Sequence, residues 1–441
     1  MTSFEQALLL HQNGQFQEAI RAYLMLIRQN PSAELSYNLG MAYWKMSDFD
    51  SAILAFDNAL KLRPDYPIAE CNLALVYWQK GDLFKTEKQF LHILSEDPWN
   101  IDILVNLANV YLQQGRPEKG IQRLQPLMSQ LKHHPIAWDC FGACWLDSGD
   151  LQMAQACFHR AHTQDGANPE IVVHLLAPIH DLQDSSLSKS FLLQSTLQFP
   201  QHWTLTFYQY FMDCWEGKTV IPPLNTPDFC IDSVQYMLSH KTPHTRIFWT
   251  VAKTLEYAVQ QAHLDGWILE FGVRFGTSIR MLQKYSQQRI VGFDSFQGLP
   301  IAWHEVPEGA YSTQGFVPDL GDNISCVDGW YSESLGPFVR QHLLPTKKPI
   351  RLLHIDCDLY ESTHEVLIEI APFLQEGSVI IFDEYWMSPH WKEDEWLAWQ
   401  ECCARHNIEY HYLAISFVTR QAVVYIDYIQ HSPPISTQTN L

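Results

Sequence analysis

Small and large apolar residues recur at a spacing of 33 to 34 positions through the first 165 residues of the chain. Each copy has a small residue, a large residue three positions later, and then a turn residue before a second apolar segment. The small positions are Ala7, Gly40, Ala74, Ala108 and Gly142, and the turn positions are Gly14, Ser47, Gly81, Gly115 and Gly149. Small residues let two helices touch, while large ones fill the space to the next pair, so the pattern predicts five stacked helix pairs.

This pattern resembles the tetratricopeptide repeat. The resemblance implies an α-solenoid over residues 1–165 whose concave surface holds a peptide, a partner protein or a second copy of the chain. The large residues of the repeat are Tyr43, Tyr77, Tyr111 and Trp145. Because their spacing is strict, we expect them in the core rather than in a ligand site. The fourth copy has Gly120 at an alanine position and no proline before Pro135, which predicts a longer exit from its second helix.

The helical spacing continues beyond the repeats but loses their columns. Residues 166–225 are expected to form degenerate helical repeats that cap the array, followed by a proline-rich linker. A second domain is then expected over residues 226–430, and residues 431–441 are expected to form a flexible tail.

The second domain combines helical spacing with short apolar runs that end in a carboxylate or a glycine turn. Four such runs begin the segments 268–278, 290–300, 352–363 and 378–386. Runs this short and apolar are typical of parallel strands that are buried on both faces. The sequence therefore predicts an α-solenoid followed by a Rossmann-like domain, a mostly parallel sheet with helices on both faces.

Composition narrows the class of protein. The chain has 441 residues, 46% of them apolar, so two or three folded domains are expected. Its formal net charge of −20 argues against nucleic acid and anionic membranes as partners. Its N-terminus lacks a basic targeting segment, and no apolar stretch approaches the roughly 18 residues of a membrane span. Because the ten cysteines lack metal-binding spacing, we expect reduced thiols and a cytoplasmic protein.

The first two apolar runs carry the first candidate chemistry. Glu270 precedes Gly272 and Gly276 without the GxGxxG pattern of dinucleotide binders. An acidic residue beside such a turn suits a ligand with an amino-acid moiety, and the missing pattern counts against a nicotinamide oxidoreductase. The second run ends at Asp294, where a carboxylate either accepts the hydroxyls of a ribose or caps the next helix.

Five motifs then follow one another within residues 240–427: E-F-G-V-x-x-G-x-S, F-D-S-F-x-G-L-P, G-W-Y-x-x-S-L, H-I-D-x-D-L-Y-E-S-T and D-E-Y. In this order they resemble the macrocin O-methyltransferase family, class I enzymes that use S-adenosylmethionine. The implied cofactor-binding residues are Glu270, Gly272, Gly276 and Ser278 at the methionine end, Asp294 and Ser295 at the ribose, and Asp328, Gly329 and Trp330 at the adenine. For Trp330, ordinary core packing is the alternative.

The resemblance also implies a divalent ion, usually magnesium, at the ends of the fourth and fifth strands. Asp356, Asp383 and Glu384 stand at these positions, and oxygen ligands of this kind select a hard cation. Asp356 is predicted as both a metal ligand and the base that takes the acceptor's proton. Glu384 departs from the aspartate that is usual in the family. His390 is predicted as an accessory base or a surface group, and Asp358 as a structural residue.

These features predict an S-adenosylmethionine-dependent O-methyltransferase, assisted by magnesium, that acts on a hydroxyl of a sugar or another secondary metabolite. The repeat array would recruit a peptide or protein partner or a second copy of the chain. The alternative is a scaffold protein with an inactive methyltransferase-like domain. Retention of the carboxylates favours the enzyme, because charged groups held together without a chemical role are costly.

Overall fold

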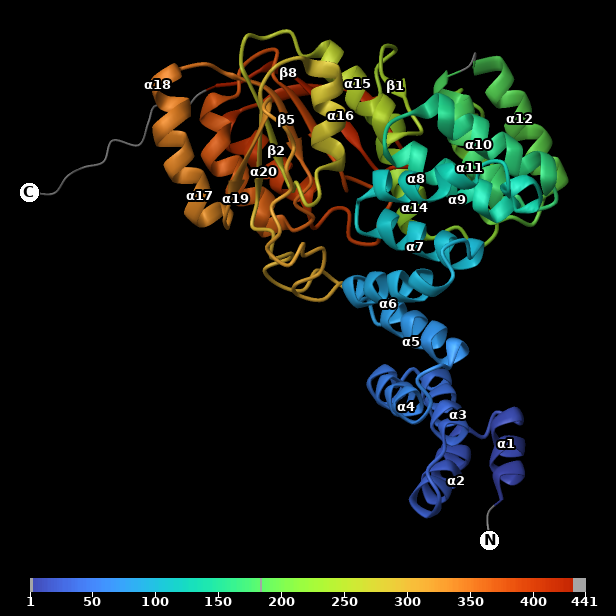
Figure 1. The fold of residues 1–441 in the computed structure, drawn as a ribbon. Coiled ribbons are helices and arrows are strands. Elements are labelled where there is room, and N and C mark those ends of the chain that lie inside the picture. The colour runs from blue at the N-terminus through green and yellow to red at the C-terminus, as the bar shows by residue number, and fades with distance from the viewer. Residues whose placement is uncertain (1–2, 183–184, 431–441) are drawn as a thin grey trace, which may run out of the picture. The chain divides into compact units, whose positions relative to one another are not determined.

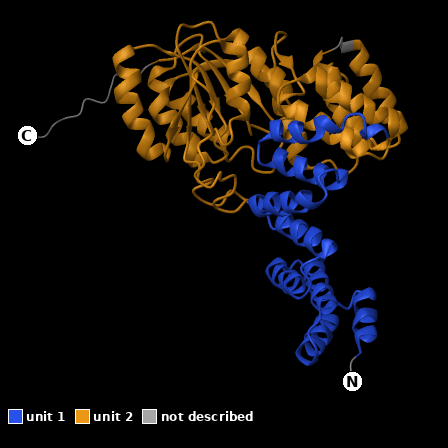
Figure 2. Cartoon of the chain, viewed as in Figure 1, with its two compact units in different colours: residues 1–132 blue, residues 133–441 orange. Residues whose placement is uncertain are grey.

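The computed structural model describes residues 3–182 and 185–430, so the predicted tail at 431–441 lies outside the described residues. The chain divides into two compact units, residues 1–132 and residues 133–441 (Figure 2). This division falls inside the predicted array, so both helices of the fifth repeat belong to the second unit. The boundary between the units thus differs from the domain boundaries predicted from the sequence.

The described residues of the first unit form four helix pairs (Figure 1). The helices are α1 (Phe4–Gln12), α2 (Phe16–Gln29), α3 (Ala33–Lys45), α4 (Phe49–Leu62), α5 (Pro67–Gln79), α6 (Leu83–Glu96), α7 (Ile101–Gln113) and α8 (Pro117–Leu124). Helix α8 ends early, and 3₁₀ turns at Gln125–Leu127 and Leu131–His133 lead to Pro135. The connection from the fourth helix pair to the next helix is therefore the longest in the array, and it occurs at the copy that departs from the sequence pattern.

The turn column and the small column of the repeat are restricted in residue type for two different physical reasons. The turn column takes the left-handed backbone in every copy, with φ between +60° and +84° at Gly14, Ser47, Gly81, Gly115 and Gly149. Glycine adopts this backbone without the steric cost of a Cβ. In the small column, a Cβ on Gly40 would lie 2.8 Å from the ring of Phe56, and one on Gly142 would lie 2.6 Å from Phe158. In these two copies the glycine is thus required by the buried phenylalanine of the partner helix.

The second unit begins with more helices of the same kind. They are α9 (Pro135–Asp147), α10 (Leu151–Gln164), α11 (Pro169–Leu182), α12 (Ser185–Gln198) and α13 (Trp203–Trp215), with α14 (Asp228–His240) after the proline-rich stretch. The stretch between α13 and α14 contains turns but no helix or strand. No helix in the described part of the chain has the length and apolarity to cross a membrane.

These early helices pack directly on the rest of the second unit. Leu151 of α10 is buried in one cluster with Leu255 of α15 (Val251–Gln261) and Ile279 of α16 (Thr277–Ser286). Asp181 of α11 accepts hydrogen bonds from the backbone N–H of Trp249 at 3.1 Å, and from the N–H and the hydroxyl of Thr250 at 2.9 and 2.6 Å. Because Thr250 is the N-cap of α15, Asp181 anchors the start of that helix.

The described residues form one eight-stranded sheet with the order β1-β7-β8-β6-β5-β2-β3-β4. The strands are β1 (Arg246–Ile247), β2 (Trp267–Phe271), β3 (Ile290–Asp294), β4 (Ile324–Asp328), β5 (Ile350–Ile355), β6 (Val379–Phe382), β7 (Glu409–Ile415) and β8 (Ala422–Tyr428). Strand β8 runs antiparallel to its neighbours β6 and β7, and all other pairs are parallel. The sheet is therefore mostly parallel, as the apolar runs predicted.

Alternate strand residues face two helix layers. Ile268 packs with α15 and α16, whereas its neighbour Leu269 packs on the opposite side. That opposite layer includes α17 (Tyr331–Phe338), α19 (Tyr360–Ile370) and α20 (Glu395–His406). A π-helical turn at Val339–Leu343 and then α18 (Leu344–Thr346) follow α17. A 3₁₀ turn at Ala371–Phe373 follows α19. Helices on both faces confirm the predicted Rossmann-like fold class.

The strand order reverses at the centre of the sheet. From β2 the chain continues to β3 and β4 on one side, and then returns to β5 and β6 on the other side of β2. In open parallel sheets, ligands bind outside the carboxyl ends of the strands where the order reverses. The fold thus points to the space beyond the ends of β2 and β5.

Candidate functional site

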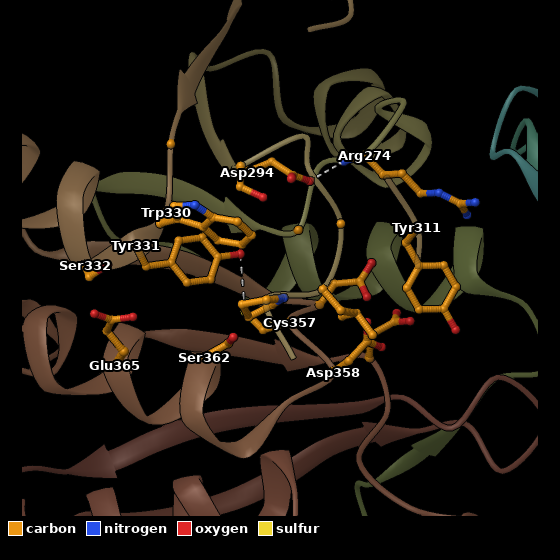
Figure 3. Close-up of a pocket in the computed structure, with 18 of the residues that line it drawn as sticks. Arg274, Asp294, Tyr311, Trp330, Tyr331, Ser332, Cys357, Asp358, Ser362 and Glu365 are labelled. Carbon is orange, nitrogen blue, oxygen red and sulfur yellow. Dashed lines mark hydrogen bonds between the residues drawn. The ribbon is translucent and has the colours of Figure 1, made fainter. Parts of the chain in front are cut away.

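A cavity of about 720 Å³ opens at this place (Figure 3). Its lining comes from the turns that follow β2, β3, β4, β5 and β6, a volume and a position typical of a small-molecule site. The predicted site residues in the lining are Gly272, Asp294, Ser295, Gly329, Trp330, Asp356, Asp383 and Glu384. Within the described residues, the lining does not include Glu270, Gly276, Ser278, Asp328 or His390.

The turn after β2 must contain glycine. Gly272 has a φ of +97°, and a Cβ placed on it would lie 1.8 Å from the carbonyl oxygen of Asp356. Gly276 has a φ of +84° at the N-cap of α16, where a Cβ would lie 2.4 Å from Leu320. The backbone at Gly272 is therefore pressed against the end of β5, and at this position the turn presents main-chain atoms to the cavity.

Glu270 lies behind the cavity, where it and His354 are fully buried. Its Oε1 accepts a hydrogen bond from the Ser278 hydroxyl at 3.0 Å, and its Oε2 lies 2.9 Å from His354 Nδ1. Burial raises the pKa of Glu270, and the bonds to His354 and Ser278 oppose this rise. His354 Nε2 lies 3.7 Å from Asp383 Oδ1. Although burial lowers the pKa of His354, its contacts with Asp383 and Glu270 raise it well above the ordinary value.

Asp294 joins two turns at the edge of the cavity. Its Oδ2 accepts the N–H of Arg274 and its Oδ1 accepts the N–H of Phe296, both at 2.7 Å. Burial raises the pKa of Asp294, and these backbone bonds act in the opposite direction. The carboxylate thus holds the turn that follows it and also lines the cavity. Among the described residues no helix begins between β3 and β4, so Asp294 does not cap a helix there, and its role at a ribose stays a prediction. Asp328, at the end of the neighbouring strand β4, is exposed.

Four more carboxyl groups line the same cavity, those of Asp356, Asp358, Asp383 and Glu384. Burial, followed by the charges of Asp383 and Asp358, raises the pKa of Asp356 well above its usual value. Burial and the charges of Glu384 and Asp383 raise the pKa of Asp358 to about 8. Asp358 also has a φ of +60°, a conformation that costs free energy in a residue with a side chain. It was predicted as structural, yet it lines the cavity beside the predicted metal ligands.

The predicted metal ligands are partly engaged by the protein. Arg420 Nη1 donates to Glu384 Oε2 at 2.8 Å, and Gln421 Nε2 donates to Asp383 Oδ1 at 2.6 Å. Over residues 3–182 and 185–430, the ligand oxygens of Asp356, Asp383 and Glu384 do not form a group within 4.8 Å of one another. The four carboxyl groups share one cavity without converging on a single point.

Three further residues at the site were not predicted. The Arg274 guanidinium lies over the ring of Tyr311, 5.2 Å from its centre, and both residues line the cavity and have positive φ. Glu395, fully buried at the start of α20, accepts the backbone N–H of Glu384 at 3.3 Å. Burial, then the neighbouring carboxylates, raises the pKa of Glu395 well above its usual value. Arg274 stands in the glycine turn, which was the signal that should have suggested it.

His390 lies in the segment between β6 and α20, outside the lining of the cavity. Its Nδ1 lies 3.1 Å from Glu393 Oε2, and its ring stacks on the ring of His304, with centres 3.8 Å apart. The structure therefore places His390 with His304 and Glu393 rather than among the cavity carboxylates. Its role as an accessory base stays a prediction.

Comparison with known families agrees with this architecture. Residues 269–385, from β2 to just beyond β6, match the model of a methyltransferase domain. Residues 4–45, 33–66 and 88–139 match models of tetratricopeptide repeats. The chain thus carries a methyltransferase domain behind tetratricopeptide repeats. No curated protein matches the chain.

Solved structures similar to this chain include several repeat proteins. MamA is 18% identical with a TM-score of 0.35, and the match covers 38% of this chain and 97% of that chain. YrrB, described as a TPR protein with an unusual peptide-binding site, is 20% identical with a TM-score of 0.35 over 42% of this chain and 96% of that chain. The C-terminal part of a repeat protein from Cytophaga hutchinsonii is 13% identical with a TM-score of 0.42 over 51% and 97%.

Proposed function

We propose that the second unit is a methyltransferase that uses S-adenosylmethionine to methylate a hydroxyl group of a sugar or another secondary metabolite. The observation that carries the proposal is the cavity at the strand reversal, which brings the glycine turn and Asp294 together with a group of carboxyl side chains. The match of residues 269–385 to a methyltransferase domain supports it. The class of acceptor comes from the resemblance to macrocin O-methyltransferases.

The glycine turn and Asp294 form the proposed donor side. S-adenosylmethionine, when bound, supplies a methyl group on a positively charged sulfur. Because Gly272 lines the cavity and has no side chain, the main chain can approach such a ligand closely. Asp294 retains lone pairs beyond those that accept its two backbone N–H groups, and these can accept ribose hydroxyls. Glu270 and Ser278 do not line the cavity, and their hydrogen bond holds the end of β2 against the start of α16.

Asp356 and Asp383 are the proposed ligands of a magnesium ion on the acceptor side. The raised pKa of Asp356 is an observation that favours a cation here, since a positive charge relieves the burial and repulsion that cause it. Magnesium, when bound, lowers the pKa of an acceptor hydroxyl. Glu384 is the third predicted ligand, and one of its two carboxylate oxygens, Oε2, is already paired with Arg420.

Asp356 is also the proposed base that takes the proton of the acceptor hydroxyl. A bound cation relieves the burial and the repulsion that raise the pKa of Asp356, and it thereby favours the ionised form that accepts a proton. His354, held between Glu270 and Asp383, adds positive charge beside these carboxyl groups. The repeats of the first unit are proposed to bind a protein or peptide partner, as stacked helix pairs do in general.

Calorimetry on the full chain tests the cofactor. We expect S-adenosylmethionine and its demethylated product to bind with a Kd on the order of micromolar. Asp294→Ala should weaken this binding at least about tenfold through lost ribose hydrogen bonds. Asp322→Ala, which removes an exposed carboxylate from the loop before β4, is the matched control and should bind like the wild type. Since Asp294 also holds two turns, Asp294→Asn and a thermal melt separate lost contacts from lost structure.

Two outcomes contradict the proposal. The first is the absence of heat with either compound, with and without magnesium, which would leave the scaffold alternative. The second is equal loss of affinity in Asp294→Ala and Asp322→Ala. For the ion, a magnesium titration should give heat that disappears in Asp383→Ala, and unchanged heat in that variant would remove the magnesium site while leaving the cofactor site standing.

A further inference from the structure

A second group of metal-ligating side chains lies outside the cavity. His304 comes from the loop between β3 and β4, and His390 and Glu393 come from the segment between β6 and α20. One ligand atom of each residue lies within 4.8 Å of the other two, and the described residues contain no other group of three that meets this limit. Two loops separated by about 80 residues in sequence thus bring two imidazoles and a carboxylate together.

A buried carboxylate supports this group. Asp394 is 6% exposed, and its Oδ2 lies 3.0 Å from His304 Nε2. This contact assigns the proton of the neutral imidazole to Nε2 and leaves the lone pair on Nδ1. Histidines that bind metal ions almost always donate their other N–H to a carboxylate or a carbonyl in this way. The arrangement therefore has both the ligand atoms and the outer carboxylate of a metal site.

We propose that His304, His390 and Glu393 bind a divalent transition-metal ion of the zinc class, at a site distinct from the carboxyl groups of the cavity. Imidazole nitrogen favours zinc and other transition-metal ions, such as copper and nickel, over magnesium. Two histidines and a glutamate are also the ligands of open zinc sites, in which water takes the remaining position. The His304 and His390 rings lie stacked with their centres 3.8 Å apart, and their side chains are 30% and 43% exposed.

A bound ion would tie together the two loops that border the cavity. The loop of His304 also carries Tyr311, and the segment of His390 begins at Asp383 and Glu384. Glu395, next to Asp394, accepts the backbone N–H of Glu384. The ion would therefore fix the spacing of the walls on the acceptor side. Binding of the ion itself does not depend on the proposed methyltransferase function.

Titration of the metal-free full chain with Zn²⁺, and with Co²⁺ followed by visible absorption, tests the site. The chain has 20 histidines and 10 cysteines, so weak binding of metal ions elsewhere is expected. Variants are therefore needed to show which residues bind the tightest equivalent, the first ion bound per chain. His304→Ala and His390→Ala should each weaken that equivalent at least about tenfold and remove its Co²⁺ absorption bands. Asp394→Asn should weaken it about 10- to 100-fold while leaving the bands in place.

Two controls define the result. His92→Ala removes an exposed histidine that lies 3.7 Å from Glu70 in the first unit, and it should leave the tightest equivalent unchanged. Asp383→Ala should also leave it unchanged. The proposal is overturned if the chain binds no Zn²⁺ tightly, if His304→Ala and His390→Ala bind like the wild type while melting at the same temperature, or if Asp383→Ala loses the same equivalent. None of these outcomes bears on cofactor binding, which is measured without added zinc or cobalt.

Discussion

The tripeptide Gly-Asp-Leu occurs at the same place in two repeats, at residues 81–83 before α6 and at residues 149–151 before α10. The local structure is the same in both. The glycines have φ values of +84° and +79°, and each aspartate side chain accepts the N–H three residues later, at 3.1 and 3.0 Å. The sequence pattern of the repeat thus determines the turn and the cap wherever it occurs.

The surroundings of the two tripeptides differ completely. Of the described atoms, none lies within 4 Å of a Cβ placed on Gly81, whereas Met281 of α16 lies 3.2 Å from one placed on Gly149. Leu83 is half-buried, but Leu151 is buried in the core of the sheet-containing unit. The comparison teaches that repeat columns predict how a helix pair closes, and that the outer surface of the pair is decided by helices that come more than 100 residues later in the chain.

The largest expected effect distinguishes the two leucines. Leu151→Ala should lower the free energy of unfolding of the second unit by about 2–4 kcal/mol, because it leaves a cavity between α10, α15 and α16. Leu83→Ala, the matched change, should cost about 1 kcal/mol and affect the first unit, since that side chain is only partly removed from water. Hydrogen exchange of the full chain in urea reports each unit separately. Equal losses, or faster exchange in the sheet for Leu83→Ala, would contradict the comparison.

A smaller effect is expected at the contact that fixes α15. Asp181→Ala should destabilise the second unit by about 2 kcal/mol, because it leaves the N–H groups of Trp249 and Thr250 without their buried acceptor. Asp48→Ala, which removes an exposed cap from α4, is the control and should cost about 1 kcal/mol in the first unit. Hydrogen exchange of α15 follows the change. A loss at Asp181 no larger than at Asp48 would mean that α11 merely abuts the sheet.

The same contrast explains how much of the fold was predictable. Helix pairs follow from local spacing, and the strands follow from apolar runs that end at Gly272 or Asp294. The place where the compact units divide does not follow from any local pattern. It depends on contacts such as that of Leu151 with Leu255, about 100 residues apart. Sequence periodicity continues through the fifth repeat, although that repeat belongs to the second unit, where Leu151 packs with α15 and α16.

The candidate site shows a similar limit. Asp294 and the carboxyl groups stand at strand ends, so their position was predictable from the apolar runs. The partners of these groups were not. His354 meets Glu270 across 84 residues, and Arg420 holds Glu384 across 36. His304 and His390 were absent from any common motif, because two loops meet only after the sheet has formed. Long-range pairing of polar side chains leaves no periodic signal in the chain.

The smallest expected effect isolates the contact of one turn. Gly81→Ala and Gly149→Ala both place a Cβ on a left-handed backbone, which costs about 1 kcal/mol in each. Only Gly149→Ala also presses on Met281, so it should cost up to about 1 kcal/mol more. A double-mutant cycle with Met281→Ala measures that difference as a coupling energy of about 0.5–1 kcal/mol by urea unfolding. Gly81→Ala combined with Met281→Ala should be additive, and a coupling of the same size there would show that the turn of the fifth repeat has no special contact with α16.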